Sequence, residues 1–306
     1  MLALTALSSS FRQTGVYRNT LRPILKRLVG VGAAPQPVVP ASDVPSVTTS
    51  VFFPRPASLP DPATADGALL KRISEHKWYH TLDLGDGIIT PGFYDHTPAL
   101  GLHPLPKDLT GKRCLDVASF DGFWAFEMER RGAAEVVALD IDSWLDLDLP
   151  DYYKQSQLLE RTGPVLQTGE GFKLAHERLK SKVERRICNV YNLSPKDFGE
   201  FDVVFCGDLL LHLTNPLHAM QRIFSVTKGE AYFMEPYIPS TVGQGPIIFL
   251  DADLSDCHWW RFGHDFLEKA ARSAGFTNID VRDDIDVRTR TYPQQPVPRV
   301  ILRARP

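Results

Sequence analysis

The sequence predicts a doubly wound α/β fold with a mostly parallel sheet of seven strands. From about residue 109 onward, short apolar runs alternate with segments whose apolar residues recur at helical spacing. Strands that alternate with helices form parallel sheets that are covered on both faces. The last two apolar runs are joined by a connection without helical pattern, so this pair is expected to be antiparallel. The chain has 306 residues, 43% of them hydrophobic, which suffices for one large domain with additions or at most two domains.

The predicted elements follow one another in a regular order. Strands are expected at 113–119, 135–142, 185–191, 201–213, 229–237, 277–284 and 298–305. Helices are expected at 66–78, 123–133, 151–161, 171–184, 216–227 and 263–276. Gly132 and Gly275 close two of these helices, because glycine readily adopts the backbone conformation that ends a helix.

The segment before the first helix differs in composition from the rest of the chain. Residues 1–64 comprise a basic arm and a proline-rich linker, and the first 42 residues contain no Asp or Glu. One interpretation is a disordered arm, or a start codon placed too early, on a cytoplasmic protein. The alternative is an organelle transit peptide, since such peptides are rich in Arg and Ser and poor in acids.

Two further segments are predicted to lie beside the ligand site. Residues 65–108 form an N-terminal extension that closes over the site of the main domain, residues 109–306. The stretch 82–92 contains an Asp-Gly and a Pro-Gly dipeptide, which favour a hairpin or clamp. The aromatic-rich segment 237–262 follows the fifth strand, where substrate-side insertions sit in such folds.

Charge and cysteine content exclude several classes of protein. The formal net charge is −3 and the pI is about 6.3, which gives no general reason to expect binding to nucleic acid or to a membrane. The four cysteines form no CxxC pair and show no metal-ligand spacing with histidine, so no metal site is expected and a reducing compartment fits best. No apolar run is long enough to span a bilayer.

The loop after the first predicted strand is the expected ligand site, because ligands of doubly wound sheets bind beyond the carboxyl ends of the strands. This loop contains Asp116, Ala118, Phe120 and Gly122. Asp140 ends the second strand about twenty residues later, where an acidic side chain can accept both hydroxyl groups of an adenosine ribose.

Two kinds of cofactor use this geometry. A dinucleotide needs a Gly-x-Gly-x-x-Gly turn, so that its pyrophosphate can approach backbone N–H groups. Here Ala118 and Phe120 occupy two positions where glycines would stand. S-adenosylmethionine carries no phosphate and tolerates a looser loop, provided that a carboxylate such as Asp116 lies near its ammonium group. The loop therefore favours S-adenosylmethionine over a nicotinamide dinucleotide.

Three stretches of the sequence carry a resemblance to a known family. They are LTGKRCLDVASFDGFWAFEMERRGAAEVVALDID, LLLHLTNPLHAM and CHWWRFGHDFLEKAARSAGF. Together they resemble the wobble-uridine tRNA methyltransferases, a family that includes carboxymethyl-transferring members, and the likeness runs from about Trp78 to the C-terminus. The resemblance implies a Rossmann-like class I methyltransferase that uses S-adenosylmethionine. It implies either tRNA or a small molecule as substrate, because the family's label covers enzymes of both kinds.

The sequence departs from the carboxymethyl-transferring members of that family. Those members hold the extra carboxylate of their cofactor with a lysine, a tyrosine and an arginine. Here Leu211 stands at the tyrosine position, His80 or Thr81 stands where the lysine should be, and only Arg299 could match the arginine. A buried carboxylate needs charge-assisted partners, so ordinary methyl transfer is expected.

The candidate site residues fall into three groups. The expected cofactor ligands are Asp116, Ala118, Phe120, Gly122, Asp140, Ile141, Asn189, Val190 and Asp208. His212 is the candidate general base, because it follows the fourth strand and its ordinary pKa of about 6.5 suits proton removal near neutrality. The candidate substrate-pocket residues are His80, Tyr94, His258, Trp259, Trp260 and Arg299. Glu235 ends the fifth strand near the pocket and has no assigned role.

The expected reaction is methyl transfer to an oxygen or nitrogen nucleophile of a small metabolite. The internal basic run, from Arg178 to Arg186, is interspersed with Glu177 and Glu184 and is interpreted as a solvated face. A large RNA would need phosphate contacts that this charge pattern does not offer. The alternatives are a tRNA wobble-uridine methyltransferase, which the family resemblance favours, and a non-catalytic partner-binding protein, which Ala118 and Phe120 in the loop favour.

Overall fold

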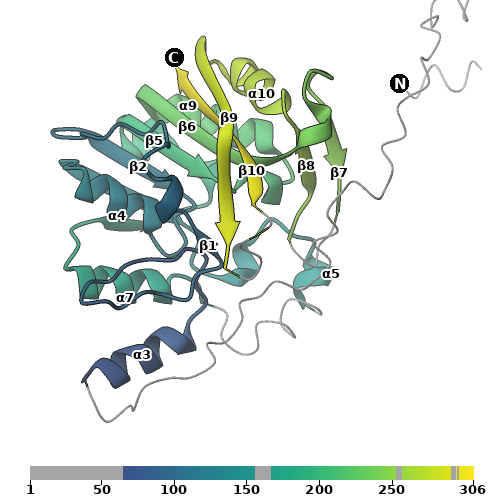
Figure 1. Cartoon of the computed structure of the whole chain (residues 1–306). Helices are drawn as coiled ribbons and strands as arrows, with labels where there is room; N and C mark the ends of the chain where they lie inside the picture. Colours follow the sequence, from purple (N-terminus) through teal and green to yellow (C-terminus); the bar gives the residue numbers. More distant parts are fainter. Residues whose placement is uncertain (1–64, 156–166, 253–256, 291–293, 295) are drawn as a thin grey trace, which may run out of the picture. The chain divides into compact units, whose positions relative to one another are not determined.

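A sheet of ten strands organises the described part of the chain (Figure 1). The computed structural model describes residues 65–155, 167–252, 257–290, 294 and 296–306, and all of them belong to one unit, residues 49–306. Residues 1–64 lie outside the described residues, and with them the predicted basic arm and the interpretation as a transit peptide. No helix of the described segments is long and apolar enough to cross a membrane.

Seven strands form the body of this sheet, as the sequence predicts. They are β2 (Arg113–Val117), β3 (Glu135–Asp140), β4 (Glu184–Ile187), β5 (Phe201–Gly207), β6 (Thr227–Ile238), β9 (Asn278–Thr289) and β10 (Val297–Arg305). The order across the sheet is β1-β9-β10-β6-β5-β2-β3-β4. Strands β2 to β6 are parallel, while β10 runs antiparallel to both β6 and β9. The doubly wound, mostly parallel sheet and its antiparallel final pair are therefore confirmed.

Three short strands lie outside the prediction. Strand β1 (Tyr94–Asp95) pairs with the end of β9. Strands β7 (Ile248–Leu250) and β8 (Trp260–Gly263) form an antiparallel pair, and β8 continues beside the end of β6. The segment expected as a substrate-side insertion thus extends the sheet beyond the carboxyl end of β6.

Helices cover both faces of the sheet (Figure 1). Helices α3 (Ala65–Glu75), α4 (Phe123–Arg130) and α7 (Glu170–Leu179) contribute to one apolar core. Helices α9 (Pro216–Val226) and α10 (Phe266–Ala274) contribute to the other. Two short helices, α5 (Asp151–Tyr153) and α8 (Pro195–Phe198), lie in connections. Successive residues of β5 alternate between the two cores, since side chains of a strand alternate between its faces.

Local chemistry explains where the long helices begin and end. The side chain of Asn215 accepts a hydrogen bond from the amide of His218, and Pro216 occupies the first turn of α9, where its missing N–H costs nothing. Gly275 follows α10 with a φ of 125°, and a Cβ there would lie 2.8 Å from the ring of Phe224. Only glycine fits this close contact between α9 and the end of α10.

Several predicted boundaries are wrong. The fourth strand ends at Gly207 rather than at 213, because the chain turns at Asp208 and continues as a 3₁₀ turn, Leu210–His212. The third strand ends at Ile187, since Asn189 caps a second 3₁₀ turn. The last helix begins at Phe266, because β8 precedes it. The helix expected at 151–161 is described only for Asp151–Tyr153, and residues 156–166 lie outside the described residues.

The N-terminal extension packs against the main sheet. An antiparallel bridge between Asp83 and Ile89 closes a hairpin at the predicted Asp-Gly turn. Gly92 passes so close to the chain at His80 that a Cβ would lie 1.9 Å from the His80 carbonyl carbon. Trp78 is 1% exposed, and its indole N–H donates to the carbonyl of Ile73. The extension thereby brings residues 79–81 to the carboxyl end of the sheet.

Candidate functional site

The connections of β2 and β5 show where a ligand site is expected in this fold. These two strands are neighbours, yet β2 connects onward to β3 on one side and β5 to β6 on the other. In doubly wound sheets, ligands bind at this switch point, beyond the carboxyl ends of the strands. The loop 116–122 follows β2, and Asp208 follows β5, so both predicted groups of ligands flank the switch point.

The loop after β2 has an unusual backbone. Ala118, Phe120 and Gly122 have φ values of 60°, 48° and 88°, all in the left-handed region. This conformation costs a non-glycine residue roughly 1–2 kcal/mol. Ala118 and Phe120 therefore adopt the turn that glycine would adopt, and their side chains do not prevent it. A Cβ at Gly122 would lie 2.6 Å from the ring of Phe126, so the loop and α4 touch there.

Asp140 ties the end of β3 to this loop. One carboxylate oxygen accepts the amide N–H of Phe120 at 2.6 Å, and the other accepts that of Ile141 at 2.7 Å. Burial raises the pKa of Asp140 to about 6, although these two amide hydrogen bonds oppose the shift. A carboxylate offers about four acceptor positions, so each oxygen keeps one for a further donor. The neighbouring Asp142 is instead paired with Arg185 at 2.9 Å.

Asp116 lies deeper in the same loop. It is 1% exposed, and its carboxylate accepts the amide N–H of Ala125 in the first turn of α4, at 3.0 Å. Burial raises the pKa of Asp116 to about 7, while the charge of His80 acts in the opposite direction. A carboxylate with so high a pKa is destabilised in its charged form, and a cationic ligand would relieve this.

Asp121 joins the loop to the N-terminal extension. One of its carboxylate oxygens accepts the amide N–H groups of Tyr79 and His80, at 2.8 and 2.7 Å. The other oxygen contacts Nδ1 of the His80 ring at 2.5 Å, and both side chains are buried. The ring of His80 stacks on Phe123, with centroids 5.3 Å apart. His80 is thus fixed in orientation by a buried acid.

The end of β4 lies next to that of β3, with Ile187 opposite Asp140 in the register. Asn189 follows as the cap of a 3₁₀ turn, its side-chain oxygen accepting the amide N–H of Tyr191 at 3.0 Å. Val190 is buried. Ile141, Asn189 and Val190, which the sequence predicts as cofactor ligands, therefore lie at the carboxyl ends of the neighbouring strands β3 and β4.

A buried polar cluster lies at the other end of the crevice. Asp208 accepts hydrogen bonds from Arg299 at 3.0 Å and from the hydroxyl of Tyr79 at 2.9 Å, both through Oδ2. The side chains of Arg299 and Asp208 are 1% and 5% exposed. The guanidinium carbon of Arg299 also lies 5.1 Å from the ring centre of Tyr94. We call Tyr79, Tyr94, Asp208 and Arg299 the Asp208 cluster.

Several buried atoms in and beside the Asp208 cluster have no hydrogen-bond partner among the described residues. They are Oδ1 of Asp208, Nε and Nη1 of Arg299, and Oε2 of Glu235. Oε1 of Glu235 accepts the amides of Leu209 and Leu210, so this acid holds the loop after β5. Burial, followed by the charge of Asp208, raises the pKa of Glu235 well above its ordinary value. Unpaired buried donors and acceptors are costly, so the Asp208 cluster is a candidate place for a polar ligand.

His212 and the tryptophans form a second group, in and beside the 3₁₀ turn Leu210–His212 that follows Asp208. Nδ1 of His212 lies 2.9 Å from the carbonyl oxygen of Cys257, and its ring centre lies 5.0 Å from that of His258. A carbonyl can only accept, so Nδ1 carries the proton and Nε2 of the neutral ring carries the lone pair. Burial lowers the pKa of His212, which keeps this neutral form.

Trp259 and Trp260 tie the segment before α10 to neighbouring loops. The indole N–H of Trp259 donates to the carbonyl of Asp148 at 2.6 Å, and that of Trp260 donates to the carbonyl of Leu213 at 2.8 Å. The amide of Trp259 donates to the carbonyl of Leu211. These bonds hold the segment in place, which is a structural role whatever the ring faces contact.

A small pocket lies beside the loop 116–122. It is bounded by Phe120 and Asp121, by Trp144, by the end of α3 and by residues 167–172 at the start of α7. The Phe120 and Trp144 rings have centres 6.0 Å apart. This pocket borders the crevice on the side of the N-terminal extension. Within the described ranges, no group of three or more His, Cys, Asp or Glu residues could hold a metal ion.

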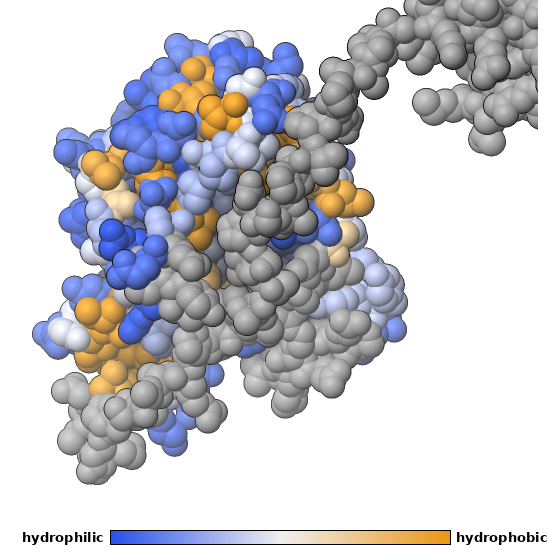
Figure 2. Space-filling model, turned by 45° about the vertical axis from the view of Figure 1, so that its right-hand side comes forward, coloured by the Kyte–Doolittle hydropathy of each residue, from blue (hydrophilic) through white to orange (hydrophobic). Residues whose placement is uncertain are grey.

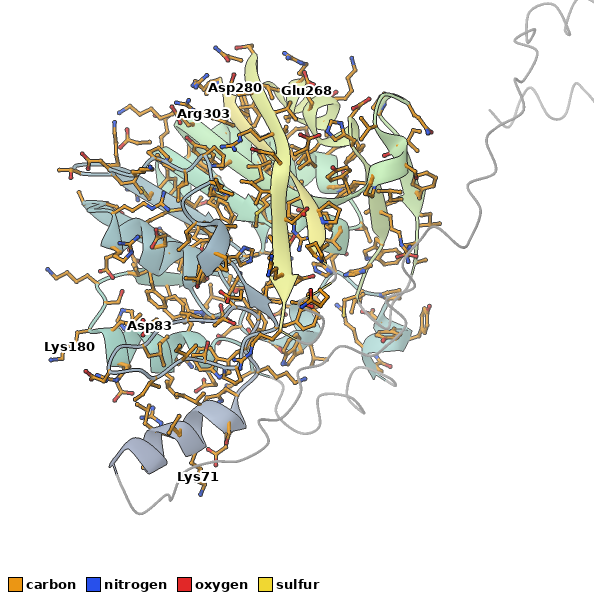
Figure 3. All side chains as sticks on the ribbon, in the orientation of Figure 1. Lys71, Asp83, Lys180, Glu268, Asp280 and Arg303 are labelled. Carbon is orange, nitrogen blue, oxygen red and sulfur yellow. The ribbon has the colours of Figure 1, made fainter. Side chains whose placement is uncertain are left out.

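The internal basic run is largely paired with acids. Arg178 pairs with Asp86, Arg185 with Asp142, and Arg186 lies 3.9 Å from Glu184. Lys180, at the end of α7, projects away from the fold (Figure 3). The face in Figure 2 likewise carries hydrophilic side chains over most of its described surface, with hydrophobic ones between them.

The predicted residues thus fall into two sets in the structure. The carboxyl ends of the parallel strands and the extension beside them carry one set, which comprises the loop 116–122, Asp140, Ile141, Asn189, Val190, Asp208, His80, Tyr94 and Arg299. His212, His258, Trp259 and Trp260 form the second set. Tyr79 and Asp121 are not among the residues predicted from the sequence. Asp121 stood inside the quoted loop, but its partners are 41 and more residues away, so no local pattern identifies its role.

Comparison with known proteins gives a family match over most of the described residues. Residues 93–281 match the family described as "Methyltransferase domain". Two curated relatives are tRNA U34 carboxymethyltransferases. The one from Campylobacter hominis is 25% identical over 159 residues, which cover 51% of this chain and 43% of the relative. The one from Ectopseudomonas mendocina is 27% identical over 191 residues, covering 61% and 51%. The chain spans about half the length of these relatives.

Solved structures of low sequence identity are also similar to parts of the chain. The N-terminal domain of EvdMO1, solved in the presence of SAH and D-fucose, is 17% identical, with a TM-score of 0.49 over 82% of this chain and 99% of that domain. A 1,6-didemethyltoxoflavin-N1-methyltransferase of Burkholderia thailandensis is 19% identical, with a TM-score of 0.40 over 64% and 71%.

Proposed function

The chain belongs to the methyltransferase domain family, and from that premise we propose that it transfers a methyl group from S-adenosylmethionine to an oxygen or nitrogen atom of a small metabolite. The observation that carries this proposal is the arrangement at the switch point. The loop 116–122 and Asp140 form one half of the crevice, and the partly unpaired Asp208 cluster forms the other. We infer that the cofactor and the acceptor bind between these two halves, so that the methyl group can pass from one to the other.

The chain's residues fit S-adenosylmethionine. Asp140 keeps free acceptor positions at the end of β3, as a ribose diol requires. Asp116 is a buried acid, and burial raises its pKa. A nearby ammonium group would lower this pKa again and so favour the charged carboxylate. Ile141, Asn189 and Val190 offer apolar surface and a backbone turn for the adenine.

In this mechanism the protein aligns the reactants and removes a proton. S-adenosylmethionine supplies a methyl group on a positively charged sulfur. The loop 116–122 and Asp140 would hold this cofactor in line with the acceptor's oxygen or nitrogen, and a base of the chain would take up the proton that the acceptor loses on methylation. His212 is our candidate for this base, because it lies in the 3₁₀ turn that follows Asp208, whose charge acts on it. Nε2 would accept the proton, because Nδ1 donates to the Cys257 carbonyl. Its lowered pKa keeps Nε2 available at neutral pH.

Two observations favour a small acceptor. The Asp208 cluster is buried beneath the extension that carries Tyr79 and Tyr94, so a bound group is enclosed rather than laid on an open surface. The basic run pairs with acids, and its paired arginines are not free to contact an RNA backbone. The two relatives favour the alternative acceptor, a tRNA wobble uridine, since they are tRNA U34 carboxymethyltransferases. A non-catalytic partner-binding protein remains the third alternative.

The test is a calorimetric titration of the full chain with S-adenosylmethionine, followed by an acceptor screen. We expect an affinity on the order of micromolar, within the usual range for enzyme substrates. Labelled methyl transfer to a panel of hydroxyl and amine metabolites, compared with transfer to unmodified tRNA, then identifies the acceptor class. Absence of binding contradicts the enzymatic proposal and supports the non-catalytic alternative. Transfer to tRNA alone contradicts the small acceptor.

A further inference from the structure

The pair formed by Asp208 and Arg299 has a feature that a purely structural ion pair lacks. Both side chains are at least 95% buried, and they meet at 3.0 Å. Only one oxygen of Asp208 is used, however, and it receives both Arg299 and the hydroxyl of Tyr79. Oδ1 of Asp208 and two nitrogens of Arg299 have no partner among the described residues. The pair therefore keeps unused polar atoms in the interior, beside the turn that follows β5.

The backbone at Asp208 supports a functional interpretation. Its φ is 50°, a left-handed conformation that glycine adopts freely and that aspartate adopts at a cost of roughly 1 kcal/mol. Its amide donates to the carbonyl of Met234 at 2.8 Å, so the turn is held in place by β6. An aspartate side chain is thus kept at a position where glycine would relieve strain. Strain of this kind collects at functional sites.

The charge of the pair decides which ligands it can hold. A protein that transfers a carboxymethyl group, as the two relatives are named for, moves a group that bears a carboxylate. Burying a carboxylate requires a cation with free hydrogen bonds. Arg299 is the cation of the Asp208 cluster, and Asp208 already neutralises it. A second carboxylate would meet the negative charge of Asp208 as well as the positive charge of Arg299.

We propose that Asp208 is an internal counter-ion that makes the crevice select a cofactor whose transferable group is uncharged. The inference rests on the proposed function and deepens it, because it names the residue that separates methyl from carboxymethyl transfer. The chain's own carboxylate takes the position on Arg299 that a carboxylated donor would need. Removing the Asp208 carboxylate leaves Arg299 buried without a counter-ion, so that Arg299 could pair with a carboxylate of the ligand.

The experiment compares two probes on the full chain by calorimetry. They are S-adenosylmethionine and its carboxylated analogue, S-adenosyl-S-carboxymethyl-homocysteine. We expect the unaltered protein to bind S-adenosylmethionine at least tenfold more tightly than the analogue. Asp208→Gly should shift this ratio by at least tenfold towards the analogue. Glycine suits the left-handed turn, but the loss of the carboxylate leaves Arg299 buried without its counter-ion, so urea unfolding of the variant is measured alongside binding. Asp208→Asn, which keeps the shape and loses the charge, should shift the ratio in the same direction.

Two controls separate charge selection from a general change in the crevice. Asp142→Asn removes an acid that also pairs with an arginine at the end of β3, and it should leave the ratio unchanged. Adding Arg299→Met to Asp208→Gly should abolish the gain for the analogue, since no cation remains. Equal affinity of the unaltered protein for both probes, or an unchanged ratio in Asp208→Gly, would overturn the inference alone. Binding of neither probe would overturn the proposed function and the inference with it.

Discussion

The two halves of the crevice are built in different ways. The half formed by the loop 116–122 and Asp140 comes from one continuous strand–helix–strand stretch of the chain. The half formed by the Asp208 cluster comes from distant segments: Tyr79 is 129 residues from Asp208, and Arg299 is 91 residues from it. The first half is held by backbone amides, and the second by side chains that hold one another. The second half should therefore be the one that depends most on single side chains.

The largest effect is expected from Arg299→Met. This substitution leaves the Asp208 carboxylate buried without its cation, and breaking a buried pair in this way costs about 3–5 kcal/mol. Urea unfolding should show this loss as a lower midpoint. Asp208→Asn combined with Arg299→Met removes both charges and should recover more than half of the loss. A single variant that loses less than about 1 kcal/mol would contradict the view that this half depends on the pair.

In the other half, Asp140→Ala should weaken S-adenosylmethionine binding by roughly 100-fold. It removes the ribose acceptor, and hydrogen bonds to charged groups are worth about 1.5–3 kcal/mol each. It also frees the amide of Phe120, so the loop loses one of its fixed points. The matched control is Asp142→Ala, two residues away and paired with Arg185, for which we expect less than a threefold change in the dissociation constant. Equal losses in the two variants would show that Asp140 has no special part in binding.

The same difference explains what the sequence predicts and what it does not. The presence of seven main strands, the antiparallel final pair and the positions of Asp116 and Asp140 at strand ends follow from local periodicity and from one loop pattern. Tyr79 and Asp121 were missed because their roles arise from tertiary contacts between the extension and the loop. The end of β5 was placed six residues too late, at 213, since Leu209 to Leu213 continue the apolar run after the backbone has turned at Asp208.

A substitution at Asp116 tests whether the loop 116–122 is less stable than it could be because it keeps a buried acid for cofactor binding. Its pKa is about 7 in the folded protein and about 3.8 in the unfolded chain, so between these values the folded state holds a proton that the unfolded state has lost. The free energy of unfolding therefore falls as the pH rises from 4 to 7 and stays low above 7. Asp116→Asn keeps an acceptor for the amide of Ala125 and removes the charge. It should stabilise the protein by up to about 4 kcal/mol at pH 8 and by almost nothing at pH 4.

Chemical denaturation at the two pH values measures this difference. Stabilisation that is the same at both values would mean that packing, and not ionisation, limits the stability of the loop. Loss of S-adenosylmethionine affinity in the stabilised Asp116→Asn variant would link the cost of burying this acid to cofactor binding.

The smallest effect is expected outside the crevice, at the end of α7. Lys180 and Lys182 belong to the basic run and have no ion pair among the described residues, and Lys180 points away from the fold (Figure 3). Replacing both with alanine should change stability by less than about 0.5 kcal/mol, as is usual for surface positions. Methyl transfer to a small acceptor should not change, at low salt or at high salt. If the acceptor were instead a tRNA, each lost phosphate contact would lower the salt dependence of binding by about one charge, because fewer counterions would be released. A salt titration of this double variant therefore distinguishes a small, enclosed acceptor from a polyanionic acceptor that also contacts these surface lysines.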